Sequence, residues 1–175
     1  EMIRQAATDG IERGKLTQEQ ARVLITRIAR VASVTELPMG LELVIETVPE
    51  KLELKHSVLR QLADRRPDII ATNTSALSID SLATTLPAPE RFLGMHFFNP
   101  VWSIQLVELI RGRHTSVSTL DKAKAFAAQL GKESLTVSDV PGFATSRLDL
   151  IASLEAMRML ESGVASAEDI DRAAV

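Results

Sequence analysis

Five short apolar runs alternate with amphipathic stretches between residues 43 and 137, and this alternation limits the folds open to the chain. The runs are rich in β-branched and aliphatic residues, which is typical of strands buried on both faces. The predicted strands are LVIETV at 43–48, DIIATN at 68–73, RFLGMHFF at 91–98, QLVELI at 105–110 and ESLTV at 133–137. We therefore expect an α/β domain with a doubly wound, mostly parallel sheet covered by helices.

Amphipathic stretches with capping signals separate the strands. Thr17 and Gln20 have the spacing of a capping box, and they predict a helix over 17–30. Further helices are predicted over 51–65, over 78–86 after the cap Ser78, and over 119–130 between Ser118 and Gly131. After Pro141 the pattern changes to a long helix, 143–162, and to another helix that starts at Ser166. The sequence thus predicts one domain over 1–140 and the start of an all-helical domain over 141–175.

Composition excludes several classes of function. Twenty basic and 23 acidic residues give a net charge of −3, which does not favour nucleic acid or an anionic membrane as a partner. The chain contains no cysteine, so disulfides, thiolate zinc sites and cysteine nucleophiles are excluded. It also contains no tyrosine, which excludes a Tyr-Lys dehydrogenation site. The first residues are charged and resemble no signal peptide, so we expect a cytoplasmic protein that acts on a small molecule.

His96 lies in the strand-like stretch GMHFFNP, and Glu108 lies in the next predicted strand. Strand alternation places Glu108 on one face with Leu106 and Ile110. If the two strands are neighbours, the carboxylate would fix one imidazole tautomer and make the other ring nitrogen a general base. Two alternatives remain open at this point. Glu108 could reach solvent at a strand edge, and His96 could be a hydrogen-bonded structural histidine.

Polar side chains follow the second predicted strand, where the chain reads ATNTSALSI at 71–79. Active sites of open α/β sheets lie at the carboxyl ends of the strands, so Asn73, Thr74 and Ser75 could orient a substrate or a cofactor. The same residues could simply satisfy a turn. Glu50 and Lys55, after the first strand, could likewise belong to a turn and a solvated helix face.

Taken together, these motifs resemble the NAD-dependent L-3-hydroxyacyl-CoA dehydrogenase family, and the resemblance covers nearly the whole chain. The combination of HFFNP and LVE is its most specific part. The matching motifs are VIETVPEKLELK, ATNTSALSI, RFLGMHFFNP, LVELI, LGK at 130–132 and DVPGFATSRL at 139–148, all in the family's order. The resemblance implies a Rossmann-like domain followed by a helical domain that forms a homodimer.

The resemblance also implies a reaction and its residues. A 3-hydroxyacyl-CoA is oxidised to the 3-ketoacyl-CoA while hydride passes to NAD, as in fatty-acid β-oxidation, and no metal takes part. His96 is expected to be the general acid/base and Glu108 its partner. The residues expected to contact the acyl-CoA substrate are Ser75 and Ser146, and those expected to contact NAD are Glu50, Lys55, Asn73 and Asn99.

The sequence departs from the family pattern in two ways. No G-x-G-x-x-G motif occurs, so we expect the chain to be a fragment that binds NAD poorly by itself. Ser146 stands where the family has a substrate-contacting asparagine, and Trp102 and Gln105 replace the commoner residues after HFFNP. A catalytically silent protein on the same scaffold is one alternative. Another α/β dehydrogenase, acting on a sugar or a hydroxy acid, is a second.

Overall fold

The computed structural model describes residues 2–174, which form two units divided after Leu37. The first unit contains α1 (Met2–Glu12), α2 (Gln18–Thr26) and the 3₁₀ turn η1 (Val34–Glu36). Ala7 and Ala21 are buried within this unit. The capping box at Thr17 is confirmed, because the backbone N–H of Gln20 donates to Thr17 Oγ1 at 3.1 Å and that of Thr17 donates to Gln20 Oε1 at 2.8 Å. The helix ends four residues earlier than predicted.

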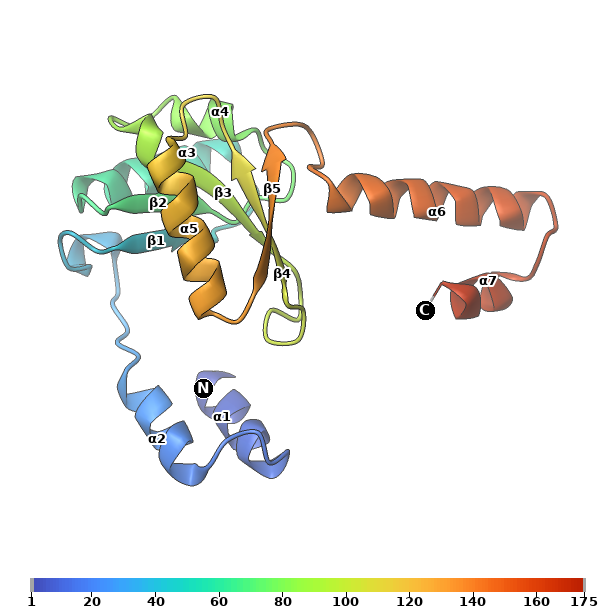
Figure 1. The fold of residues 1–175 in the computed structure, drawn as a ribbon, viewed down its shortest axis with the longest axis horizontal. Helices are drawn as coiled ribbons and strands as arrows, with labels where there is room; N and C mark the ends of the chain where they lie inside the picture. Colours follow the sequence, from blue (N-terminus) through green and yellow to red (C-terminus); the bar gives the residue numbers. More distant parts are fainter. Residues whose placement is uncertain (1, 175) are drawn as a thin grey trace. The chain divides into compact units, whose positions relative to one another are not determined.

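The second unit is built on a five-stranded sheet with the strand order β1-β2-β3-β4-β5 (Figure 1). The strand pairs β1–β2, β2–β3 and β4–β5 are parallel, and β3–β4 is antiparallel. The strands are β1 (Leu43–Glu46), β2 (Ile69–Thr72), β3 (Phe92–Phe97), β4 (Leu106–Arg111) and β5 (Glu133–Ser138). The predicted α/β fold with a mostly parallel, Rossmann-like sheet is confirmed.

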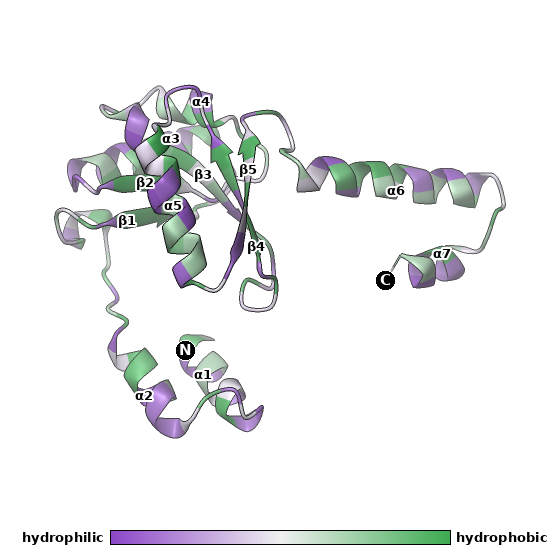
Figure 2. Cartoon of the chain, in the orientation of Figure 1, coloured by the Kyte–Doolittle hydropathy of each residue, from purple (hydrophilic) through white to green (hydrophobic). Residues whose placement is uncertain are grey.

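Helices cover both faces of the sheet. On one face, Ala123 and Ala127 of α5 (Val117–Gln129) share an apolar cluster with alternate residues of β2, β3 and β4. On the other face lie α3 (Leu52–Asp64) and α4 (Ile79–Ala83). A Cβ at Gly94 of β3 would come within 2.8 Å of Ile79 Cδ1 and 2.9 Å of Ile110 Cβ. Only glycine lets α4 approach β3 this closely. Figure 2 shows β1, β2 and β3 as strongly apolar.

The helix boundaries correct two predictions. The cap of α5 is Ser116 rather than Ser118, because Ser116 Oγ accepts the backbone N–H of Thr119 at 3.1 Å. Helix α4 ends at Ala83 and not at Leu86, because Leu86 precedes a proline and that position disfavours helical backbone. A short 3₁₀ turn, η2 (Pro89–Arg91), then leads into β3.

Two helices follow β5, namely α6 (Thr145–Glu161) and α7 (Ala167–Ala173). Helix α6 contains many apolar residues, which Figure 2 colours green, and Leu148, Ile151 and Met157 among them are exposed. Within residues 2–174, no helix has the length and hydropathy needed to cross a membrane.

Candidate active site

His96 and Glu108 face each other across β3 and β4. They are direct partners in the antiparallel register, and His96 Nδ1 lies 2.8 Å from Glu108 Oε2. Glu108 is fully buried, and the side chain of His96 is 8% exposed. An ionised carboxylate only accepts hydrogen bonds, so Nδ1 carries the proton and Nε2 carries the lone pair. The sequence analysis offered this pairing as one of two readings of Glu108, and the reading in which Glu108 reaches solvent at a strand edge is wrong.

The second ring nitrogen of His96 is open. Nε2 has no hydrogen-bond partner among residues 2–174, yet no buried side-chain nitrogen or oxygen in that range is unpartnered. Nε2 therefore reaches the surface of the site. The ring centroid of Phe98 lies 4.7 Å from that of His96, and the ring centroid of Phe143 lies 5.7 Å away. These apolar rings limit the access of water to the imidazole.

Glu108 is also held from the start of α6. Its Oε1 accepts the backbone N–H groups of Ala144 and Thr145, each at 3.0 Å, and its Oε2 accepts the Thr145 hydroxyl at 2.9 Å. Burial alone would raise the pKa of Glu108, but the hydrogen bonds from His96, Thr145 and Ala144 outweigh burial and hold the pKa below its ordinary value. The carboxylate is thus charged and fixed in place.

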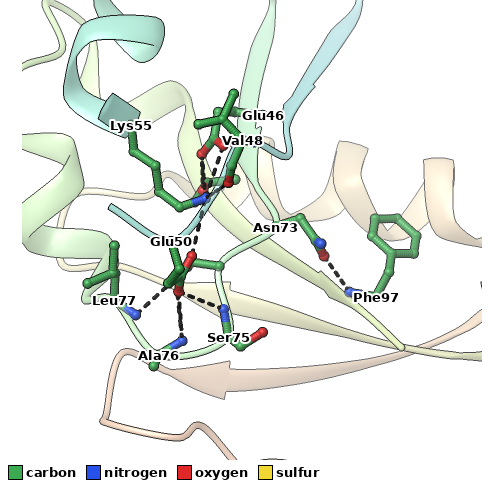
Figure 3. Close-up of polar contacts among 11 residues, drawn as sticks. Glu46, Val48, Glu50, Lys55, Asn73, Ser75, Ala76, Leu77 and Phe97 are labelled. Carbon is green, nitrogen blue, oxygen red and sulfur yellow. Dashed lines mark hydrogen bonds and ion pairs between the residues drawn. The ribbon is translucent and has the colours of Figure 1, made fainter. Parts of the chain in front are cut away.

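A buried ion pair lies at the end of β1, where Figure 3 shows Lys55 next to Glu46. Lys55 is 0% exposed, and its Nζ donates to Glu46 Oε1 at 3.0 Å and to the carbonyl oxygen of Val48 at 3.1 Å. Glu46 also accepts the hydroxyl of Thr72 at 2.7 Å. Lys55 Nζ lies 3.3 Å from Glu50 Oε2 as well, so all its donors are used within the protein.

Glu50 in turn holds the loop that follows β2. Its Oε1 accepts the hydroxyl of Thr74 and the backbone N–H groups of Ser75 and Ala76, the latter two at 3.1 and 3.2 Å. Burial alone would raise the pKa of Glu50, but the Thr74 hydrogen bond and the charge of Lys55 outweigh burial and lower it. The network therefore runs from Glu46 through Lys55 and Glu50 to the Asn-Thr-Ser loop.

The other predicted site residues differ in how they are placed. Asn73 Oδ1 accepts the backbone N–H of Phe97 at 2.8 Å, which ties the end of β2 to the end of β3 and leaves the amide nitrogen of Asn73 available (Figure 3). Ser75 and Asn99 are exposed, and Ser146 is half-buried one residue beyond Thr145. The side chains of these three residues make no hydrogen bonds within the described part of the chain. The site thus has a fixed histidine–carboxylate pair and several free polar groups.

Three supporting residues were missed by the sequence analysis. Thr145 contacts Glu108, and Asp139 accepts hydrogen bonds from Ser78 and from the backbone N–H groups of Ile79 and Asp80 at the start of α4. Lys132 donates to the carbonyl oxygens of Val101 and Ile104, which fixes the loop after HFFNP. All three join segments distant in sequence. The only feature of the sequence that pointed to these residues was their position inside two motifs shared with the family, LGK at 130–132 and DVPGFATSRL at 139–148.

Comparisons with known proteins identify the family. Residues 1–140 match the family model described as 3-hydroxyacyl-CoA dehydrogenase, NAD binding domain, and residues 142–175 match the model of the C-terminal domain. The chain belongs to the 3-hydroxyacyl-CoA dehydrogenase family. This membership confirms the resemblance found in the sequence motifs.

Curated relatives in this family include a 3-hydroxybutyryl-CoA dehydrogenase of Bradyrhizobium diazoefficiens, which is 40% identical over 160 residues. That alignment covers 90% of this chain and 54% of the relative. The mitochondrial hydroxyacyl-coenzyme A dehydrogenase of Sus scrofa is 36% identical, with 93% of this chain and 52% of the relative covered. The chain thus spans about half the length of these relatives.

Solved structures in the family have the same fold. The (S)-3-hydroxybutyryl-CoA dehydrogenase of Ralstonia eutropha matches with a TM-score of 0.86 and 38% identity, and the match covers 94% of this chain and 59% of that chain. The 3-hydroxybutyryl-CoA dehydrogenase of Escherichia coli matches with a TM-score of 0.87 and 33% identity. That match covers 93% of this chain and 35% of that one. The arrangement of the sheet and helices is therefore that of the family.

Proposed function

We propose that the whole protein is an NAD-dependent oxidoreductase that interconverts L-3-hydroxyacyl-CoA and 3-ketoacyl-CoA. One observation carries the proposal. His96 is bonded through Nδ1 to a buried, ionised Glu108 at 2.8 Å, and its Nε2 is open at the ends of the strands. This is the geometry of a general base, because the carboxylate stabilises the imidazolium that forms when Nε2 takes a proton. The family membership gives the substrate class.

The residues of this chain perform the proton transfer. His96 Nε2 takes the proton of the substrate 3-hydroxyl group during oxidation and returns it during reduction. Glu108 keeps the imidazole in the productive tautomer and orientation, and it stays ionised because its pKa is lowered. The rings of Phe98 and Phe143 shield the imidazole from bulk water, which strengthens its interaction with the carboxylate. The bound NAD supplies the hydride acceptor.

The described residues fit one half of the cofactor. The free amide of Asn73 and the side chains of Glu50 and Asn99 lie at or after the strand ends, and we assign them to the nicotinamide half. Lys55 has no exposed surface, so we propose that it acts on the cofactor through Glu50, whose carboxylate it holds. No G-x-G-x-x-G turn for the pyrophosphate occurs within residues 2–174, so we assign no residue to that group.

We assign Ser75 and Ser146 to the acyl-CoA substrate, since both hydroxyl groups lack partners within residues 2–174 and both residues lie close in sequence to groups that bind Glu50 or Glu108.

We further propose a homodimer formed through the helical domain, whose α6 exposes Leu148 and Ile151. The role in β-oxidation, the cytoplasmic setting and the domain boundary after residue 140 stay predictions.

The test is a dehydrogenase assay on the whole protein with His96→Gln and a matched control, His114→Gln. His114 is exposed and has no hydrogen bond among the described residues, so its replacement leaves the site intact. Reduction of acetoacetyl-CoA by NADH is followed by absorbance. We expect His96→Gln to lower kcat by roughly 10²- to 10⁴-fold with little change in KM, and His114→Gln to match the wild type. Near-normal turnover of His96→Gln would exclude this role for His96, and an inactive wild type would favour the catalytically silent alternative.

A further inference from the structure

Glu108 receives most of its hydrogen bonds from outside the His96 pair. Of the four donors, one is His96 Nδ1 and three belong to residues 144 and 145 at the start of α6. Each oxygen of the fully buried carboxylate accepts two of these bonds. A carboxylate has about four acceptor positions, so Glu108 is saturated and has a single possible orientation.

The Thr145 hydroxyl differs from the two backbone donors, because it shares an oxygen with the catalytic pair. Thr145 Oγ1 lies 2.9 Å from Glu108 Oε2, and His96 Nδ1 lies 2.8 Å from the same atom. A donor to this oxygen disperses its negative charge, which weakens its attraction for the imidazolium proton. The same donor prevents Oε2 from rotating away from the imidazole.

We propose that Thr145 is a positioning residue that sets both the orientation and the proton affinity of the His96–Glu108 pair. The inference rests on the proposed function for its catalytic consequence, but the hydrogen bond acts on the pair whether or not the protein turns over substrate. The hydrogen bond from Thr145 to Glu108 makes the first turn of α6 a part of the acid–base site. The start of the helical domain is then coupled to the protonation of His96.

Other charged groups around the His96–Glu108 pair do not act on the Glu108 carboxylate as the Thr145 hydroxyl does. None of the ionisable side chains on the elements packed against it forms an ion pair with Glu108 or His96 within residues 2–174, and Asp80 is engaged with Arg113 instead. These side chains are Arg111 of β4, Glu133 of β5, Asp80 of α4, Asp121, Lys122 and Lys124 of α5, and Arg147, Asp149, Glu155, Arg158 and Glu161 of α6. Thr145 is therefore the side chain whose removal changes the pair most selectively.

The experiment compares Thr145→Val with Thr145→Ser by NMR titration of the histidine ring protons in this chain. Valine has nearly the shape of threonine but no hydroxyl, and serine keeps the hydroxyl. The spectrum of His96→Gln assigns the His96 signal among the three histidines. Thr136→Val on β5 is the matched control, because Thr136 is exposed and has no side-chain hydrogen bond among the described residues.

We expect the His96 titration midpoint in Thr145→Val to move upward by about half a pH unit or more, since a lost hydrogen bond to a charged group has that order of effect. Thr145→Ser and Thr136→Val should keep the midpoint of the parent chain. In the whole protein, kcat of Thr145→Val should fall about threefold to tenfold, with KM nearly unchanged and the low-pH limb of the rate profile moved upward.

The possible results distinguish a failure of this inference from a failure of the proposed function. An unchanged midpoint in a folded Thr145→Val chain overturns the inference, whatever the whole protein catalyses. If Thr145→Val does not fold, the serine variant decides, because a midpoint for Thr145→Ser far from that of the parent chain contradicts a role for the hydroxyl. A shifted midpoint in a protein without dehydrogenase activity supports the role of Thr145 and refutes only the proposed function.

Discussion

Replacing Lys55 with methionine is expected to destabilise the second unit severely. Lys55 is 0% exposed, and methionine fills a similar volume but leaves the buried carboxylate of Glu46 without its cation. Removing one partner of a buried ion pair costs about 3–5 kcal/mol, because an uncompensated charge remains in the interior. With a denaturant dependence of about 2 kcal/mol per molar urea, the unfolding midpoint should fall by about 2 M.

Urea unfolding of the chain, followed by circular dichroism, measures this effect. Lys122→Met is the matched control, since Lys122 forms only an exposed pair with Asp68 at 3.4 Å and such pairs contribute about 0–1 kcal/mol. The double variant Glu46→Gln/Lys55→Met removes both charges and should recover much of the lost stability. A Lys55→Met midpoint equal to that of the parent chain would refute the reasoning.

Three further predictions concern the strand, the acid response and the substrate contact. Gly94→Ala should lower the free energy of unfolding by about 1–3 kcal/mol, because its Cβ would lie 2.9 Å from Ile110 Cβ; an unchanged thermal midpoint contradicts this packing. The pKa of Glu108 is lowered in the folded state, so its stabilisation is complete above the ordinary value of 4.5 and is lost as the pH falls below it. Glu108→Gln should therefore unfold with a weaker dependence on acid pH than the parent chain, and equal slopes would argue against the assignment. Ser146→Asn should lower KM for a short 3-hydroxyacyl-CoA by roughly fivefold in the whole protein, through a longer-reaching hydrogen bond; identical kinetics would remove Ser146 from the substrate site.

Local patterns were sufficient to predict much of the fold, and they left the pairing of His96 with Glu108 as one of two readings until the family resemblance favoured it. The five strands were found from their apolar runs, and alternation placed Glu108 on the face that His96 meets across the neighbouring strand. The helix cap at Thr17 was predicted correctly because the two residues of the capping box, Thr17 and Gln20, lie within four residues of sequence. At α5 two serines two residues apart could both cap the helix, and only the backbone geometry selects Ser116.

The contacts that support the site were not predictable from such patterns. The contact of Lys55 with NAD stays a prediction. The sequence did not show that its ammonium group lies between Glu46 and Glu50, because a helical repeat does not reveal the groups that a lysine side chain contacts. Thr145 meets Glu108 across 37 residues of sequence, and Asp139 meets Ser78 across 61. These contacts depend on where separate segments come together, which no spacing in a single sequence reveals.

The most direct test of the account is the pH dependence of a single turnover in Glu108→Gln. The whole protein is mixed with excess NAD and with less (S)-3-hydroxybutyryl-CoA than enzyme, and the rate of NADH formation is recorded across pH. Because the neutral amide no longer stabilises the imidazolium of His96, the rate should fall by about 10²-fold or more, and the low-pH limb should move to lower pH. A rate and profile that match the wild type would show that Glu108 does not support His96 as the base.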